Sequence, residues 1–353
     1  MSVLVKKILV LDGVSQSPLA LPFSEALQKL DVQVKYIDGK RLPKKRLYRL
    51  RRAFVKWWKK YKNPIYKHYH FPKAKSGYFR KLINDFQPDI VLVVGFSHAI
   101  ISREDLMKLK TRHGFSLVLW DTDSANYFYE TKAFMYFLEE EFRRYDFVLS
   151  FSKRMSDYLN SLELGLPRCE FFPFGAPDQG YSHKAEKTID VCFAGADNFR
   201  RLFILSSIKV KNFLIIGARW KKVFSIMPKD IQAKCTKSDR FGDSLHKQLQ
   251  QSKIVLNVTN ENFYGIETGI NLRVFEALSL GCFLLTDSYQ EIEELFNPGE
   301  SIETFSSREE LSRKIDYYLA HDEEREAIAK KGHEVFLAHY TWKKRAAAFL
   351  EFF

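Results

Sequence analysis

The segment between Lys253 and Asp287 constrains the fold more strongly than any other part of the sequence. It opens with KIVLNVT, an apolar run of strand length that ends at Thr259. A polar loop with two glycines leads into NLRVFEALSL, whose composition favours a helix, and Gly281 ends that helix. The run CFLLTD follows as a second apolar strand. This order predicts an α/β unit in which a loop opens onto a helix N-terminus.

The start of that helix is suited to a phosphate group. Free backbone N–H groups and the positive end of the helix dipole face the loop there. Arg273 and Glu276 are three residues apart and share one face of the helix. A cation beside a diphosphate and a carboxylate on sugar hydroxyls would form a nucleotide-sugar site, whereas the alternative is an ion pair on a solvated helix. We expect the following residues to bind the donor: Gly269, Ile270, Asn271, Leu272, Arg273 and Glu276.

The positive charge of the chain is concentrated in one block. The 353 residues carry a formal net charge of +13. Between Gly39 and Asn84 there are 17 Lys and Arg and no acidic residue, so the rest of the chain has a net charge of −4. A near-neutral body with one basic block indicates that residues 40–81 meet an anionic acceptor or a membrane surface, with DNA as a further possibility.

The remaining composition is that of a globular protein long enough for two α/β domains. No apolar run approaches the ~20 residues that cross a bilayer. The first residues, MSVLVKKILVLDG, predict a strand rather than a leader peptide. Four scattered cysteines without C-x-x-C spacing indicate buried reduced thiols, a cytoplasmic location and no metal site: Cys169, Cys192, Cys235 and Cys282.

Alternating strands and helices in the first half predict a parallel sheet. The first loop, DGVSQSP, has one glycine and so lacks the G-x-G-x-x-G fingerprint of dinucleotide-binding proteins. The sequence also has no P-loop and no H-E-x-x-H. These observations weigh against a nicotinamide enzyme, an NTPase and a zinc protease.

The basic block contains a predicted amphipathic helix from Arg46 to Lys62. Its apolar residues recur at three- and four-residue steps: Leu47, Leu50, Phe54, Trp58 and Tyr61. The stripe fits a peripheral membrane anchor or a platform for nucleic acid. A third reading is that the stripe is the core side of a domain helix, which the spacing favours for Leu47, Leu50 and Phe54.

Polar residues that follow strands are the other site candidates, because ligands of parallel α/β sheets bind at the carboxyl ends of strands. In the second half, Arg200 and Arg201 follow a strand that ends at Gly195. We expect one of the two to bind the donor diphosphate and the other to lie at the surface. Arg219, after the strand that ends at Gly217, is a further candidate.

In the first half, His98, Asp121 and Asp123 follow predicted strands. One of these side chains is expected to accept the proton of the acceptor hydroxyl. The alternatives are a loop histidine bonded to the backbone and an aspartate that caps the next turn. Asp12 and Gly13, at the end of the first strand, are expected to line the same cleft.

Three stretches, SKIVLNVT, NLRVFEALSLGCFLLTD and HYTWKKRAAAFLEFF, carry a resemblance to the GT-B glycosyltransferases. The branch that the chain resembles is related to the spore-maturation glycosyltransferase-like proteins. The resemblance implies two Rossmann-like parallel-sheet domains that face an interdomain cleft, at residues 1–175 and 188–338. It also implies that a helix at residues 339–353 returns to the first domain, which carries a basic aromatic insertion at about residues 40–84.

The resemblance assigns Glu276 to the nucleotide ribose. In related enzymes that retain configuration, a first glutamate precedes this one with seven residues between them. Here Thr268 stands at that place, and Glu267 is one residue further away. The sequence Asp121–Asp123 reads D-T-D, which matches the metal-binding D-x-D motif of a different glycosyltransferase fold. The resemblance to GT-B enzymes implies instead that fixed cations take the place of a metal.

The sequence therefore predicts a metal-independent glycosyltransferase with no cofactor, which uses a nucleotide sugar, with UDP-sugars favoured, as its co-substrate. We expect the acceptor to be an envelope glycan, a lipid-linked saccharide or another anionic polymer. The expected location is the cytoplasm, at the inner face of the membrane. Two alternatives are a transferase that acts on modified DNA and a non-catalytic nucleic-acid-binding protein with a degenerate GT-B fold.

Overall fold

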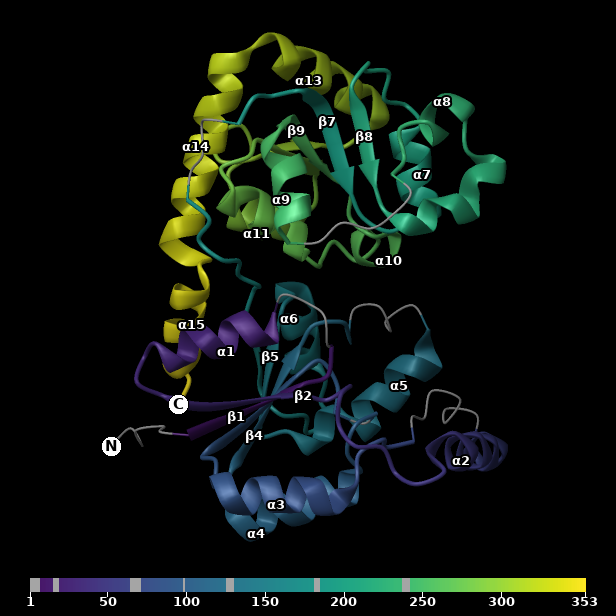
Figure 1. Ribbon diagram of the computed structural model, residues 1–353, viewed down its shortest axis with the longest axis vertical. Helices are drawn as coiled ribbons and strands as arrows, with labels where there is room; N and C mark the ends of the chain where they lie inside the picture. The colour runs from purple at the N-terminus through teal and green to yellow at the C-terminus, as the bar shows by residue number, and fades with distance from the viewer. Residues whose placement is uncertain are drawn as a thin grey trace. The chain divides into compact units, whose positions relative to one another are not determined.

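The computed structural model of the protein describes residues 7–14, 19–63, 71–97, 99–124, 130–180, 185–236 and 242–353. The chain divides into two compact units (Figure 1). Unit 1 consists of Met1–Pro173 and Trp342–Phe353, and unit 2 consists of Phe174–Thr341.

Unit 1 is built on a six-stranded sheet in the order β2-β1-β3-β4-β5-β6, in which every neighbouring pair is parallel. Its central strand β3 is fully apolar and buried, and β4 is buried from Leu117 to Asp121, as expected for a parallel sheet covered by helices. The strands are β1 (Lys7–Asp12), β2 (Gln33–Asp38), β3 (Ile90–Val94), β4 (Ser116–Asp121), β5 (Phe147–Ser150) and β6 (Cys169–Phe171). The helices are α1 (Ala20–Gln28), α2 (Tyr48–Lys62), α3 (Ser76–Phe86), α4 (Arg103–His113), α5 (Thr131–Glu140), the 3-10 turn η3 (Phe142–Arg144), α6 (Lys153–Ser161) and α15 (Trp342–Leu350).

Unit 2 is built on a five-stranded sheet in the order β11-β10-β9-β7-β8, again with parallel pairs. The strands are β7 (Ile189–Ala194), β8 (Phe213–Ile216), β9 (Ser252–Asn257), β10 (Leu284–Asp287) and β11 (Glu303–Phe305). The helices are α7 (Phe199–Leu205), the 3-10 segment η4 (Ala218–Ile226), α8 (Lys229–Gln232), α9 (Asp243–Gln250), α10 (Glu261–Tyr264), α11 (Leu272–Ser279), α12 (Gln290–Leu295), α13 (Arg308–Ala320) and α14 (Asp322–His339). The two parallel α/β sheets confirm the predicted fold class.

Helix α15 belongs to unit 1, although the chain reaches it through unit 2. It packs beside α1, as Figure 1 shows, and Phe349 is fully buried. The Phe349 ring lies 5.6 Å from that of Phe23, and Trp342 lies 6.2 Å from Trp120 in the middle of the sheet. Burial of a phenylalanine contributes roughly 1.5–3 kcal/mol, so the last helix is part of the core of unit 1.

Helix α2 differs from the other long helices because none of its residues is buried. It confirms the helix predicted from Arg46 to Lys62. The reading in which Leu47, Leu50 and Phe54 form the core side of a domain helix is wrong, because these three side chains are 60–68% exposed. In the part of the chain that the structure describes, no helix is both long and apolar enough to cross a bilayer.

Candidate functional site

The start of α11 is held in place by a chain of amide and hydroxyl groups. Asn271 caps the helix, because its Oδ1 accepts a hydrogen bond from the Arg273 amide at 3.0 Å. Its Nδ2 donates to Asn257 at the end of β9 at 2.9 Å, and Asn257 donates to Thr286 on β10 at 2.9 Å. These bonds fix the helix start against the carboxyl ends of two neighbouring strands. The predicted strand–loop–helix–strand unit is therefore present.

Backbone N–H groups gather in the turn before α11. Gly269 has φ +83°, and a Cβ atom there would meet the Phe263 ring at 2.9 Å, so the turn requires glycine. The Arg273 amide is occupied by the Asn271 cap. The amides of Ile270, Asn271 and Leu272 follow this turn at the start of the helix. The turn thus combines backbone N–H donors with the positive end of the helix dipole.

Arg273 and Glu276 form an ion pair through Nη1 and Oε2. Their side chains are 18% and 10% exposed, so the pair does not lie on a solvated helix face. The Arg273 Nε is buried and has no hydrogen-bond partner in the described part of the chain. A buried N–H without an acceptor is costly, and it leaves this guanidinium with a donor available to an added oxygen atom.

Arg200, near the start of α7, forms an ion pair with Asp287 at the end of β10. Its Nη1 donates to Asp287 at 2.5 Å and to the carbonyl of Thr259 at 2.9 Å. The guanidinium carbon lies 3.5 Å from the centre of the Tyr264 ring. Asp287 is 1% exposed and also accepts hydrogen bonds from the amide and hydroxyl of Thr259. Arg200 is therefore the counter-ion of a buried carboxylate.

Arg201 also turns inward, which contradicts the expectation that one of the two arginines lies at the surface. Its Nε donates to the carbonyl of Val258 at 2.8 Å, and its Nη1 donates to that of Ala196 at 2.9 Å. Burial, together with the nearby charges of Arg200 and Arg273, lowers the pKa of Arg201 to about 10, against the opposing charge of Asp287. Three arginines from two helices thus gather at the ends of β7 and β9.

Arg219, the weaker candidate, lies outside this group. Its side chain is 61% exposed and pairs with Asp197 at 3.1 Å. Exposed pairs of this kind contribute about 0–1 kcal/mol to stability. The structure therefore does not join Arg219 to Arg200, Arg201 and Arg273, which are half-buried.

The loop before α11 differs from the two-glutamate pattern, as the sequence indicated. Glu267 is exposed and has φ +51°, a conformation that non-glycine residues rarely adopt. Thr268 is buried, and its hydroxyl donates to Glu291 at 2.6 Å. Glu291, which is 1% exposed, was missed by the sequence analysis, because the contact joins residues 23 positions apart.

Two further residues of this region were also missed. Asp287 ends a predicted strand. The criterion that selected Arg200 and Arg219, a polar residue at the carboxyl end of a strand, would also have selected Asp287. Tyr289 is buried in the same region, close to Thr259. Burial, together with the charges of Asp287 and Glu291, raises the pKa of the Tyr289 hydroxyl well above its usual value.

In unit 1, Asp12 and Gly13 form a closely packed turn at the end of β1. The Asp12 carboxylate accepts hydrogen bonds from the Val14 amide at 2.9 Å and from the Tyr36 hydroxyl at 2.7 Å. A Cβ atom on Gly13 would lie 2.8 Å from the Phe96 carbonyl oxygen and 2.9 Å from that of Val94. Gly13 is therefore required for close approach of two backbone segments.

We expect Gly13→Ala to destabilise unit 1 by about 1–3 kcal/mol, because backbone atoms cannot move aside as a side chain can. Gly77→Ala is the matched control: it lies in the first turn of α3, and nothing is within 4 Å of its Cβ position. Alanine there should stabilise the helix by up to about 1 kcal/mol. Urea denaturation of both variants measures the difference, and equal shifts would contradict the packing at Gly13.

Asp121 lies at the end of β4 and has no exposed surface. It accepts hydrogen bonds from the amides of Asp123 and Ser124 at 3.1 and 2.9 Å, from the Ser124 hydroxyl, and from the Ser150 hydroxyl at 3.2 Å. Burial raises the pKa of this carboxyl, although the hydrogen bonds oppose the shift. These contacts are those of an aspartate that caps the next turn. Asp123 is half-buried, and His98 lies outside the described residues.

The sequence analysis did not predict a buried polar network that includes Ser97, in the loop after β3. Glu141 is fully buried and accepts hydrogen bonds from the Ser97 amide at 2.7 Å and from the Tyr145 hydroxyl at 2.7 Å. Arg144 lies 3.5 Å from the same carboxylate. No local pattern marks these residues, since the network joins Ser97 to a helix end 44 positions later.

The comparisons with known proteins agree with this architecture. Residues 200–351 match a family model described as glycosyl transferase-like. That range includes Arg200, Arg201, Arg273 and Glu276. None of the curated proteins matches the sequence.

Several solved structures have the same fold over nearly the whole chain. Sucrose-phosphate synthase from Thermosynechococcus elongatus has a TM-score of 0.70 at 12% identity, with 98% of each chain covered. Anabaena Alr3699/HepE in complex with UDP-glucose has a TM-score of 0.65 at 11% identity, with 98% of this chain and 100% of that chain covered. An alpha-glucosyltransferase in complex with UDP has a TM-score of 0.62 at 11% identity, with 98% and 99% covered. At these identities the likeness shows the fold, which is GT-B as predicted.

Proposed function

We propose that this chain, which has the GT-B fold and a glycosyl transferase-like domain at residues 200–351, moves a sugar from a nucleotide-diphosphate donor to an acceptor hydroxyl. The observation that carries the proposal is the largely buried Arg273–Glu276 pair beside the start of α11. Its side chains are 18% and 10% exposed, the Arg273 Nε has no hydrogen-bond partner among the described residues, and the pair adjoins the amides at the start of the helix.

The donor diphosphate would bind at the turn before α11. Amides of Ile270, Asn271 and Leu272 and the Arg273 guanidinium would hold its oxygen atoms, with Glu276 on the ribose. Negative charge develops on the diphosphate as the bond to the sugar breaks, and fixed cations in a shielded site stabilise it. Arg201, which donates to the carbonyls of Val258 and Ala196, would add positive potential, whereas the charge of Arg200 is offset by its ion pair with Asp287.

Two finer features of the donor site belong to the same proposal. A UDP-sugar is the favoured donor, because two of the solved structures with this fold hold UDP-glucose or UDP. We also expect fixed cations, rather than a divalent metal, to neutralise the diphosphate. Among the described residues, no group of His, Cys, Asp or Glu side chains is arranged to hold a metal ion.

Unit 1 would bind the acceptor. His98 and Asp123 are the candidates for the group that accepts the proton of the acceptor hydroxyl, since Asp121 is fully buried and caps a turn. The excess of cations between Gly39 and Asn84 favours an acceptor with negative charge, such as an envelope glycan or a lipid-linked saccharide. A cytoplasmic enzyme at the inner face of the membrane would meet such acceptors.

A panel of nucleotide sugars tests the proposal directly. The purified protein is incubated with UDP-, GDP-, ADP-, dTDP- and CDP-sugars, with and without EDTA, and both thermal stabilisation and slow donor hydrolysis are measured. We expect a UDP-sugar to stabilise the fold by about 2.7 kcal/mol at a concentration of 100 times its Kd, with EDTA making no difference. Folded protein that responds to no donor would contradict the proposal.

A further inference from the structure

Helix α2 exposes the side chains that an ordinary helix of a globular protein would bury. Leu50, Phe54, Trp57, Trp58 and Tyr61 recur at helical spacing and are 45–78% exposed. The side chains of α2 that are half-buried lie on the opposite side: Tyr48, Val55, Lys56 and Lys59. The helix therefore turns its apolar stripe toward the solvent.

The exposed rings form one continuous strip. Trp57 lies 6.4 Å from Phe54, 6.4 Å from Trp58 and 6.2 Å from Tyr61, with which it stacks. The Lys62 ammonium group lies 5.1 Å from the centre of the Trp58 ring. A contiguous apolar strip on a soluble protein indicates a surface that is covered by something else.

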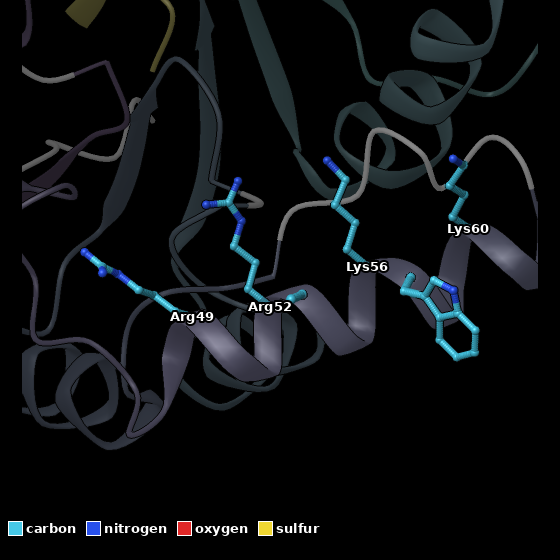
Figure 2. Close-up of a pocket in the computed structure, with 6 residues that line it drawn as sticks. Arg49, Arg52, Lys56 and Lys60 are labelled. Carbon is cyan, nitrogen blue, oxygen red and sulfur yellow. The ribbon is translucent and has the colours of Figure 1, made fainter.

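Cations line the helix beside this strip. Arg49, Arg52, Lys56 and Lys60 project to the same side of α2, as Figure 2 shows, and together with Ala53 and Trp57 they line an open pocket of about 430 Å³. No acidic residue occurs between Gly39 and Asn84 to neutralise them. The occupant of this surface must therefore offer dense negative charge next to an apolar layer.

We propose that α2 binds the surface of an anionic lipid bilayer. The aromatic strip would lie about 5–10 Å deep at the boundary between headgroups and acyl chains, and the arginines and lysines would contact headgroup phosphates. Trp and Tyr are the side chains that prefer this interface. Membrane binding by α2 would not depend on glycosyl transfer, because it involves no residue of unit 2.

The arrangement fits a bilayer better than a nucleic acid. A single-stranded nucleic acid places its phosphates and bases along one groove, so the protein interleaves cations and aromatic rings on a single face. On α2 the four cations and most of the rings occupy different faces of the helix. That separation matches the layered order of a membrane, in which charge lies above hydrocarbon.

Vesicle binding tests the proposal, and the tryptophan fluorescence of α2 can report it. Trp120, Trp220 and Trp342 are buried, so of the five tryptophans only Trp57 and Trp58 are exposed. The full chain is mixed with vesicles of phosphatidylcholine alone, or of phosphatidylcholine with phosphatidylglycerol, and floated on a density gradient. We expect flotation with the anionic vesicles only, weakened by salt, and quenching of tryptophan fluorescence when the acyl chains are brominated.

Two α2 variants, each with a control elsewhere in the chain, separate the contribution of charge to vesicle binding from the contribution of apolar side chains. Each cation near an anionic surface strengthens binding by about fivefold, so Lys56→Glu with Lys60→Glu should weaken it by at least ~25-fold. Lys330→Glu with Lys331→Glu on α14 changes the net charge equally and should leave binding unchanged. Trp57→Ala with Trp58→Ala should abolish flotation, whereas Ile226→Ala, which removes an exposed apolar side chain of unit 2, should not. Because no α2 residue is buried, the melting temperature of the α2 variants should stay that of the wild type.

Three results would overturn the proposal. The first is an absence of flotation with either vesicle at physiological ionic strength. The second is equal weakening by the α2 and α14 charge variants, which would mean that net charge alone drives binding. The third is binding to single-stranded or duplex DNA at matched salt without vesicle binding, which would assign the surface to nucleic acid.

Discussion

Replacing Arg273 by alanine is expected to lower kcat/KM for glycosyl transfer by at least about 100-fold. The Arg273 side chain is 18% exposed and pairs with Glu276, and its Nε has no partner among the described residues. Removal of a fixed donor that meets developing negative charge in such a site costs about 10²–10³ in rate. The measurement is transfer or slow hydrolysis of the donor that responds best in the nucleotide-sugar panel.

The Arg273→Ala variant needs a test of folding, because it leaves Glu276 without its counter-ion. Glu276→Gln keeps the shape of the side chain without the charge, and it should weaken donor binding while the fold is retained. Arg313→Ala, on the exposed side of α13, removes an arginine of the same unit and should leave activity unchanged. Donor affinity and turnover at wild-type levels in Arg273→Ala would place the diphosphate elsewhere.

Arg200→Ala is expected to destabilise unit 2 by about 3–5 kcal/mol, because it removes the counter-ion of a carboxylate that is 1% exposed. Asp287 would keep its hydrogen bonds from Thr259 but would remain charged in a buried position. The Tyr264 ring would also lose the guanidinium that stacks on it. The loss is measured as a shift in the midpoint of urea denaturation.

Arg219→Ala is the matched control for this prediction. It also removes an arginine that follows a strand of the same sheet and pairs with an aspartate, but its side chain is 61% exposed. We expect a loss below about 1 kcal/mol. Similar losses in the two variants would mean that Arg200 contributes no more than a surface ion pair.

The sequence predicted the α11 region well because its signals are local. The glycines of the loop and the spacing of Arg273 and Glu276 lie close together in the sequence, whereas the cap that Asn271 forms was not predicted. Local patterns also predicted the alternation of strands and helices, and hence the parallel sheets. The partners of the site residues could not be predicted, because Arg200 and Asp287 are 87 positions apart in the sequence.

Helix α2 shows a second limit of sequence reasoning. The period of its apolar residues predicts a helix with an apolar stripe, and this is what the structure contains. The same period fits a core helix and an interfacial helix, because it does not specify which side of the helix meets the rest of the chain. Three side chains assigned to the core by spacing are instead among the most exposed apolar groups of the protein.

The return of α15 to unit 1 affects the order in which the two units can mature on the ribosome. Unit 2 is one continuous segment, so all of its residues are available before Trp342 is synthesised. Most of unit 1 is synthesised before unit 2. The rings of Trp342 and Phe349, which pack against Phe23, are added only at the end of translation. The nascent N-terminal sheet therefore keeps an apolar surface exposed while the whole second unit emerges, and transiently exposed apolar surface of this kind is prone to aggregation.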